Sequence, residues 1–132
     1  MLKTYKISTK RRVQAVEITS EVRNAVRESG VKDGICVVYV PHTTAGVVVN
    51  ESYDPAVMED LMAKLSQLVP AGMGYRHLEG NADSHIKSSI VGNSASIIVE
   101  DGNLLLGRWG GVFFLEFDGP RDRRFHVKII EG

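Results

Sequence analysis

Residues 74–89 read Gly-Tyr-Arg-His-Leu-Glu-Gly-Asn-Ala-Asp-Ser-His-Ile-Lys-Ser-Ser, a glycine-bearing turn that runs into a helix. Short side-chain oxygens accept hydrogen bonds from the free N–H groups of a first helical turn. Asn81 or Asp83 is therefore expected to cap this helix through its side chain. The rest of the chain supplies a second polar segment upstream and a run of strands downstream.

The spacing of apolar residues predicts how this helix faces the core. Ala82, Ile86 and Ile90 recur every four residues, which places them on one side of a helix. His85 and Lys87 would lie beside that side, near a helix start whose positive dipole end and N–H groups favour anions. These residues fit two interpretations: part of an anion-binding site, or an ordinary capped helix with solvated polar side chains.

The segment before this turn is predicted to be an amphipathic helix. Asp54 followed by Pro55 is a strong helix start, and the helix is expected to end before Pro70. Its apolar stripe is typical of core packing rather than of a cofactor site. The stripe consists of Met58, Leu61, Leu65 and Leu68.

Another helix is expected to begin with Thr19 or Ser20 as its cap and to stop at Gly30. Strands are expected around the helices, with a hairpin turn at Asp101–Gly102. The expected strands are one or two within residues 4–16, then 35–40, 47–49, 94–100, 103–106, 112–117 and 124–130.

The predicted order is therefore ββα-ββ-αα-ββββ, with about three helices. Helices grouped between strand-rich ends favour an α+β fold with largely antiparallel sheets over a doubly wound parallel sheet. The chain shows no internal repeat and no linker. Residues 1–132 are expected to form one compact, β-rich domain.

The composition excludes several classes of protein. Sixteen Lys and Arg residues balance sixteen Asp and Glu residues, which gives no electrostatic footprint for nucleic acid or an anionic membrane. No apolar run approaches the ~20 residues of a membrane span, and the N-terminus lacks the apolar core of a signal peptide. The single cysteine, Cys36, is expected to be a small buried hydrophobic residue. We expect a soluble cytoplasmic protein with no nucleic-acid or membrane partner.

Two polar clusters lie at predicted ends of strands and helices, where folds commonly place sites. The first consists of His42, Thr43, Thr44, Asn50 and Glu51. The second consists of His77, Glu79, Asn81, Asp83, His85 and Lys87. Imidazole is a general acid or base near neutral pH and a ligand for zinc-like metals. Three histidines beside carboxylates therefore predict either acid–base catalysis or a metal site.

A third candidate element is the glycine-rich stretch Gly107-Arg108-Trp109-Gly110-Gly111. Glycines let a backbone approach a ligand closely, and N–H groups in such loops bind anionic oxygens. The stretch lacks the pattern of a P-loop and that of a dinucleotide-binding turn. The alternative is a kinked strand with Trp109 packed in the core. His126, in the last predicted strand, is expected to be structural or to lie at an interface.

Four motifs, in order, carry a resemblance to a known family. They are Pro41-His42-Thr43-Thr44-Ala45, Asn50-Glu51 with Asp54-Pro55, residues 81–89, and Leu106-Gly107-Arg108-Trp109-Gly110-Gly111-Val112. Together they resemble the YjbQ family of secondary thiamine-phosphate synthase-like proteins over nearly the whole chain. The resemblance implies a compact α+β homotrimer with a weak thiamine-phosphate synthase activity, as a side activity. Gly110 departs from the family pattern, because many relatives carry a longer polar residue there.

The resemblance and the residue chemistry together give each polar group an expected role. His85 is expected to transfer protons or bind metal, with Asp83 orienting it and Glu51 as the second carboxylate. Substrate binding is expected from His42, Thr43, Thr44, Asn50, Asn81, Lys87, Arg108 and Trp109. Departing pyrophosphate needs positive charge or a divalent metal on its oxygens. Asp83 and Glu51 could hold Mg²⁺, or His42, His77 and His85 could bind Zn²⁺.

A second interpretation is a homotrimer without catalysis that binds a metal or a phosphorylated metabolite. The expected partners under either interpretation are a small phosphorylated metabolite and further copies of the chain. Residues 111–117 and 125–130 are long apolar strands for so small a domain, and a trimer would cover strand edges that are otherwise open.

Overall fold

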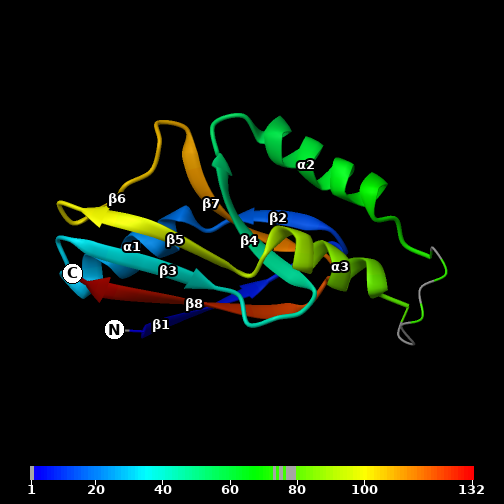
Figure 1. The fold of residues 1–132 in the computed structure, drawn as a ribbon, viewed down its shortest axis with the longest axis horizontal. Coiled ribbons are helices and arrows are strands. Elements are labelled where there is room, and N and C mark those ends of the chain that lie inside the picture. The colour runs from blue at the N-terminus through cyan, green and yellow to red at the C-terminus, as the bar shows by residue number, and fades with distance from the viewer. Residues whose placement is uncertain (1, 73, 75, 77–79) are drawn as a thin grey trace.

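The computed structural model describes residues 2–72, 74, 76 and 80–132, and over them it contains eight strands and three helices. Figure 1 shows their arrangement. In chain order they are β1 (Leu2–Ser8), β2 (Gln14–Glu17), α1 (Thr19–Ser29), β3 (Gly34–Tyr39), β4 (Ala45–Glu51), α2 (Pro55–Leu68), α3 (Ala82–Val91), β5 (Ser94–Glu100), β6 (Asn103–Leu104), β7 (Gly110–Glu116) and β8 (Asp122–Glu131). The predicted order and the α+β class are confirmed.

Two antiparallel sheets form the body of the protein. The larger sheet has the strand order β1-β8-β3-β5-β6, and the smaller one has the order β2-β7-β4. All pairings between the described strands are antiparallel. The predicted hairpin at Asp101–Gly102 is confirmed, since both residues have positive φ angles, of 50° and 78°, as a tight β5–β6 turn requires.

The main core lies between the two sheets. Alternate residues of each strand point to one face, so Phe125, Val127 and Ile129 of β8 meet Val112 and Phe114 of β7. α1 adds its apolar stripe to the same cluster. Cys36 is fully buried there, as predicted, and burial raises the pKa of its thiol to about 11.

A second, smaller core lies on the other face of β7. Phe113 and Leu115 of β7 and Phe117, which follows the strand, form one buried cluster with residues of α2. The α2 residues of this cluster are Met58, Met62 and Leu65. Leu68, which was predicted to belong to the stripe, is the last residue of the helix and is 65% exposed.

The predicted start of α2 is confirmed, whereas the cap of α1 is not. The carboxylate of Asp54 accepts a hydrogen bond from the N–H of Ala56 at 2.9 Å, and Pro55 occupies the first turn. At α1 the N-cap residue is Ile18, and Thr19 is already helical. The Thr19 hydroxyl instead donates to Glu17 at 2.8 Å and accepts from the N–H of Val112 at 2.9 Å.

The predicted apolar face of α3 is wrong. Ile86 and Ile90 are 37% and 60% exposed, and the buried face carries Asp83, Ser84, Lys87 and Ser88. Neither Asn81 nor Asp83 caps the helix with its side chain. Polar groups on other strands and loops stabilise this buried face. The local spacing of apolar residues gives no indication of these groups.

Gly34→Ala is expected to lower the free energy of unfolding by about 1–3 kcal/mol, as overpacking does. A Cβ at Gly34 would clash with the carbonyl oxygen of Ile130, so the central β3–β8 pairing would have to shift. Gly107→Ala is the matched control, because its Cβ would meet no atom within 4 Å. Urea unfolding followed by circular dichroism measures both; equal stability of the two variants would contradict the tight β3–β8 approach.

Candidate functional site

The buried polar face of α3 is held by an ion-pair network centred on Asp83. The Asp83 carboxylate accepts two hydrogen bonds from the Arg12 guanidinium, at 3.1 and 3.2 Å, and one from the Lys87 ammonium at 3.1 Å. Asp83 and Lys87 are almost fully buried. Burial alone would raise the pKa of Asp83, but the hydrogen bonds from Arg12 and Lys87 outweigh it and lower that pKa. Asp83 is therefore ionised, and its ion pairs with Arg12 and Lys87 hold α3 in place.

Two serines attach the same helix face to the smaller sheet. The Ser84 hydroxyl donates to the carbonyl of Phe117 at 2.5 Å, and the Ser88 hydroxyl donates to the carbonyl of Ala45 at 2.7 Å. At the start of the helix, the Asn81 amide donates to Asp118 at 2.7 Å. These bonds fix the register of α3 against the start of β4.

The loop from residue 42 to residue 44 is tied to β8 by a second buried ion pair. The Arg123 guanidinium pairs with Glu116 and donates to the hydroxyl of Thr44 at 2.8 Å. Glu116 also accepts from the Thr9 hydroxyl at 2.7 Å and from the N–H of Asp118 at 3.0 Å. Burial would raise the pKa of Glu116, yet the bonds from Arg123 and Thr9 lower it. The hydroxyl of Thr44 therefore accepts a hydrogen bond from the buried ion pair between Arg123 and Glu116.

His42 has one ring nitrogen engaged by the backbone. The N–H of Arg124 donates to Nε2 of His42 at 3.0 Å. Because a donor faces Nε2, the proton of the neutral ring resides on Nδ1. Burial lowers the pKa of His42, and the nearby Arg123 charge lowers it further. His42 is therefore a neutral imidazole at pH 7 that offers its Nδ1–H as a donor.

His42 and His85 line one surface pocket of about 380 Å³. It lies between the loop after β3 and α3 with the two residues that follow this helix. The other lining residues are Thr43, Ser88, Ser89, Gly92 and Asn93. Hydroxyl, amide and imidazole groups dominate this lining, and it contains no carboxylate among the described residues. Groups of this kind donate hydrogen bonds to anionic oxygens.

The remaining predicted site residues lie at the opposite end of β4. Asn50 and Glu51 pair with Gly111 and Gly110 at the start of β7, and a seven-residue strand spans roughly 20 Å. Within one chain, Glu51 cannot contact a small ligand that is held between His42 and His85. For the same reason Asp83 and Glu51 of one chain cannot share one Mg²⁺ ion, so this site stays a prediction that would require two copies of the chain.

The glycine-rich stretch of residues 107–111 lies beside Glu51, and the ring of Trp109 projects from it. Trp109 is 45% exposed, so the alternative that packed it in the core is wrong. Its ring contacts Tyr53, with centroids 4.7 Å apart, and the Arg108 guanidinium lies 4.7 Å from its centroid. The carbonyl of Trp109 accepts from the N–H of Ser52 at 2.7 Å, which fixes the loop. Arg108 and Trp109 are therefore remote from the histidine pocket of their own chain.

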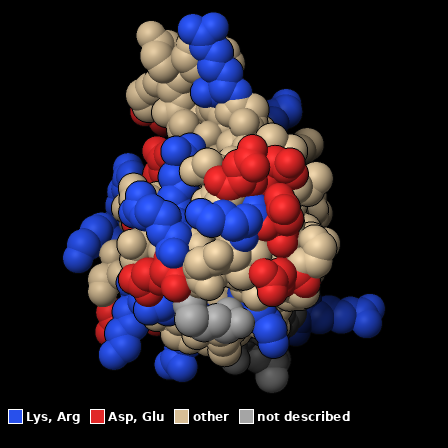
Figure 2. Space-filling model, turned by 90° about the vertical axis from the view of Figure 1, so that its left-hand side faces the viewer, with Lys and Arg blue, Asp and Glu red and all other residues tan. Residues whose placement is uncertain are grey.

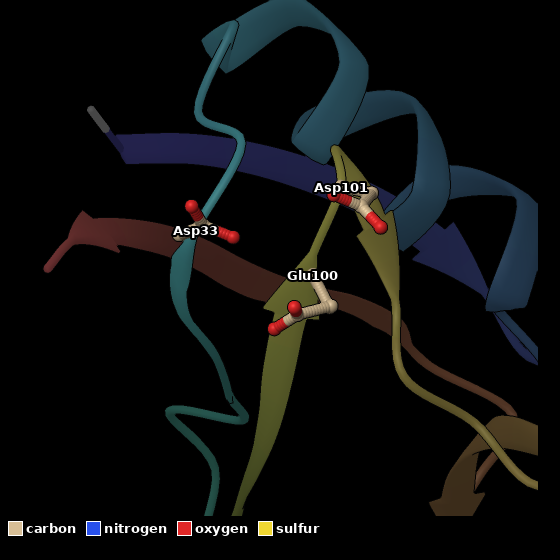
Figure 3. Close-up of side chains that lie close together, drawn as sticks. All are labelled: Asp33, Glu100 and Asp101. Atoms are coloured by element: carbon tan, nitrogen blue, oxygen red, sulfur yellow. The ribbon is translucent and has the colours of Figure 1, made fainter.

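The predicted three-histidine metal site stays a prediction. His77 and Glu79 lie outside the described residues, and His42 has its Nε2 engaged by Arg124. Among the described residues, the one group that brings three ligand atoms within 4.8 Å of one another is Asp33, just before β3, with Glu100 and Asp101 at the β5–β6 turn (Figure 3). All three are exposed, and exposed carboxylates gather in turns without an ion.

Charges of both signs are mixed on the end of the molecule that carries this turn. Figure 2 shows Lys and Arg side chains interspersed with Asp and Glu side chains there.

No described helix has the length and apolar character needed to cross a membrane.

Several residues of the site region were missed from the sequence. Arg12 was not among the predicted site residues, because nothing local links it to Asp83, 71 residues away. Arg123 did carry a signal, because it alternates with the buried residues Phe125 and Val127 and therefore belongs to the inner face of β8. A charged residue on that face predicts a buried partner of opposite sign, which is Glu116.

Comparisons with known proteins match the chain along nearly its whole length. The family model described as UPF0047 protein YjbQ-like matches residues 3–132. The chain is 56% identical over 130 residues to the UPF0047 protein MJ1081 of Methanocaldococcus jannaschii, which covers 98% of this chain and 94% of the relative. It is 44% identical over 131 residues to the UPF0047 protein YugU of Bacillus subtilis, covering 98% and 99%.

Solved structures show the same fold. A crystal structure of an uncharacterised YjbQ/UPF0047 protein from Clostridium acetobutylicum has a TM-score of 0.95 and 49% identity, covering 97% of this chain and 99% of the other. A YbjQ-like protein of unknown function from Sulfolobus solfataricus has a TM-score of 0.97 and 32% identity, covering 100% and 97%.

Proposed function

Because the chain belongs to the UPF0047 YjbQ-like family, we propose that it is a cytoplasmic transferase that binds a phosphorylated metabolite between His42 and His85. The observation that carries the proposal is their shared, donor-rich pocket. Two histidines 43 positions apart in the sequence meet there, with serine, threonine and asparagine side chains around them. A pocket of about 380 Å³ is large enough for a small phosphorylated metabolite.

The reaction that the family resemblance suggests is the formation of thiamine phosphate. The ring nitrogen of thiazole phosphate attacks the methylene carbon of hydroxymethylpyrimidine diphosphate. The new C–N bond forms as the C–O bond to the diphosphate breaks, and pyrophosphate leaves with the bonding electrons. The product ring becomes a cationic thiazolium. An enzyme accelerates this step by stabilising the charge that develops on the leaving oxygens.

The residues of the pocket have separate roles in this reaction. His42 donates its Nδ1–H to a phosphoryl oxygen, and the hydroxyl of Thr43 and the amide of Asn93 add further donors. His85 supplies a proton or a hydrogen bond to the departing pyrophosphate. Asp83 and Lys87 act indirectly, because they hold α3 and therefore the position of His85.

His85→Ala is expected to lower the rate of thiamine-phosphate formation by about 10²–10⁴-fold, the range of a lost general acid. The thermal midpoint should change little, because His85 is only partly buried. His126→Ala is the matched control: His126 bonds to Thr4 in the larger sheet and lies outside the pocket. Full activity of the His85→Ala protein would contradict the role of this histidine.

The second candidate function is binding without catalysis. The donor-rich pocket supports it equally, since donors that hold a phosphoryl group need not promote a reaction. A zinc-like ion bound through His77 and His85 belongs to this version. Metal analysis of the pure protein together with calorimetric titration of thiazole phosphate separates the two functions. Stoichiometric metal or tight phosphate binding without turnover favours binding alone.

We also propose that the chain assembles as a homotrimer. The outer face of the larger sheet exposes the isoleucines Ile35, Ile98 and Ile130, and a strand face of this kind favours burial against another copy. Sedimentation equilibrium is expected to give three times the mass of the chain. A monomer at micromolar concentration would contradict the assembly.

A further inference from the structure

A second cleft, distinct from the histidine pocket, lies between β2 and the first half of α2. Its volume is about 450 Å³, within the range of small-molecule sites. The floor is apolar, and several of its side chains belong to the smaller core. The floor residues are Val13, Ala15, Met58, Met62 and Phe113.

The rim of this cleft is strongly acidic. It carries the four carboxylates of Glu17, Glu51, Asp54 and Glu59 against the single guanidinium of Arg11, a net charge of −3. None of the four carboxylates forms an ion pair with another described residue. The hydrogen bonds found for two of them come from neutral donors, namely the Thr19 hydroxyl to Glu17 and the Ala56 N–H to Asp54. No described residue outside the cleft therefore balances the negative charge of the rim.

The spacing of the carboxylates distinguishes between two kinds of cation. A bare divalent ion needs several oxygens within one coordination sphere. Among the described residues, no three of these carboxylates offer ligand atoms within 4.8 Å of one another. Carboxylates spread around an apolar floor instead match a larger cation, whose charge faces the rim while its body covers the floor.

We infer that this cleft binds a small organic cation with an apolar body, of the arylalkylammonium type. The ring displaces water from the partly exposed side chains of Val13 and Ala15 and contacts the edges of Met58 and Met62, which is the favourable hydrophobic step. The ammonium group lies at the rim, where the negative potential attracts cations and repels anions. The cleft and the phosphate pocket lie on different parts of the chain, so this inference stands independently of the proposed reaction.

The test uses three probes of nearly the same shape, 2-phenylethylammonium, 2-phenylethanol and phenylacetate, with the full-length protein. Binding is followed through the methionine methyl NMR signals. The cation is expected to shift Met58 and Met62 at the lowest concentration, the alcohol at a higher one and the anion least. Equal binding of all three probes, or no shift of either methyl signal at millimolar cation, would overturn the inference.

The charge of the rim is tested by a double variant, Glu17→Gln with Glu59→Gln. Loss of two partly solvated carboxylates is expected to weaken binding of the cation about five- to tenfold, and to leave binding of the alcohol unchanged. The matched control is Glu21→Gln with Asp60→Asn, which removes the same charge outside the cleft. Equal loss of affinity in both proteins, or no loss in the rim variant, would overturn the inference.

Discussion

Arg123→Met is expected to lower the free energy of unfolding by about 3–5 kcal/mol, as the loss of one member of a buried ion pair does. Arg123 is 7% exposed, and Glu116 is fully buried between the two sheets. The guanidinium donates to Glu116 at 2.9 Å through Nε and to the Thr44 hydroxyl through Nη2. Methionine fills the space but leaves the Glu116 carboxylate charged in a medium of low polarity. Urea unfolding at neutral pH measures the change.

Arg124→Met is the control for this prediction. Arg124 is the next residue of β8, but its side chain is exposed, so the change should stay within about 0.5 kcal/mol. The double variant Arg123→Met with Glu116→Gln should recover part of the lost stability, because it removes the buried charge that was left unpaired. If Arg123→Met and Arg124→Met unfold at the same urea concentration, the buried pair does not hold the sheets together.

Asp83→Asn is the second large effect, also expected to cost about 3–5 kcal/mol. Lys87 is 2% exposed and would lose its carboxylate partner, whereas Arg12 is partly exposed and can turn to solvent. The lysine ammonium would then be buried with no charge to balance it. Thermal and urea unfolding both report the loss.

The control for Asp83 is Asp60→Asn on the exposed side of α2, for which little change is expected. Asp83→Asn with Lys87→Met should be more stable than Asp83→Asn alone, because no buried charge remains unpaired. If Asp83→Asn is as stable as the wild type, Asp83 is free for the catalytic role that the family resemblance implies. A large loss of stability instead means that its activity has to be compared at equal folded fraction.

The order of helices and strands was predictable because each signal is local. Asp54–Pro55 starts α2 through a bond to a residue two positions away. Asp101 and Gly102 form a tight turn from their own backbone angles. Such interactions need no knowledge of the rest of the fold, which explains why the predicted order agrees with the structure.

The orientation of α3 was not predictable because its partners are distant in sequence. Ile86 and Ile90 have the spacing of a core face, yet the helix buries Asp83 and Lys87. Arg12, which lies on the loop before β2, and the carbonyls at the ends of β4 and β7 provide what the polar face needs. Sequence periodicity indicates which face of a helix is apolar. It does not indicate whether a polar face has hydrogen-bonding or ion-pairing partners elsewhere in the fold.

The candidate site was predictable in part. The sequence placed His42 and His85 at ends of secondary structure, and the structure brings them into one pocket. It also grouped Glu51 and Trp109 with them, although β4 separates the two ends by roughly 20 Å in one chain. Residues that belong to the same group of family motifs can lie in different parts of the fold, because their order in the sequence does not determine the distances between them in space.

The most direct measurement follows the imidazole NMR signals of His42, His85 and His126 during a titration with thiazole phosphate. The signals of His42 and His85 are expected to shift along one common binding curve, because both side chains line the pocket that holds the phosphoryl group. His126 lies in the larger sheet, bonded to Thr4, and its signal should stay in place. Unchanged signals of His42 and His85 at saturating ligand, or two different binding curves, would contradict a shared phosphate pocket.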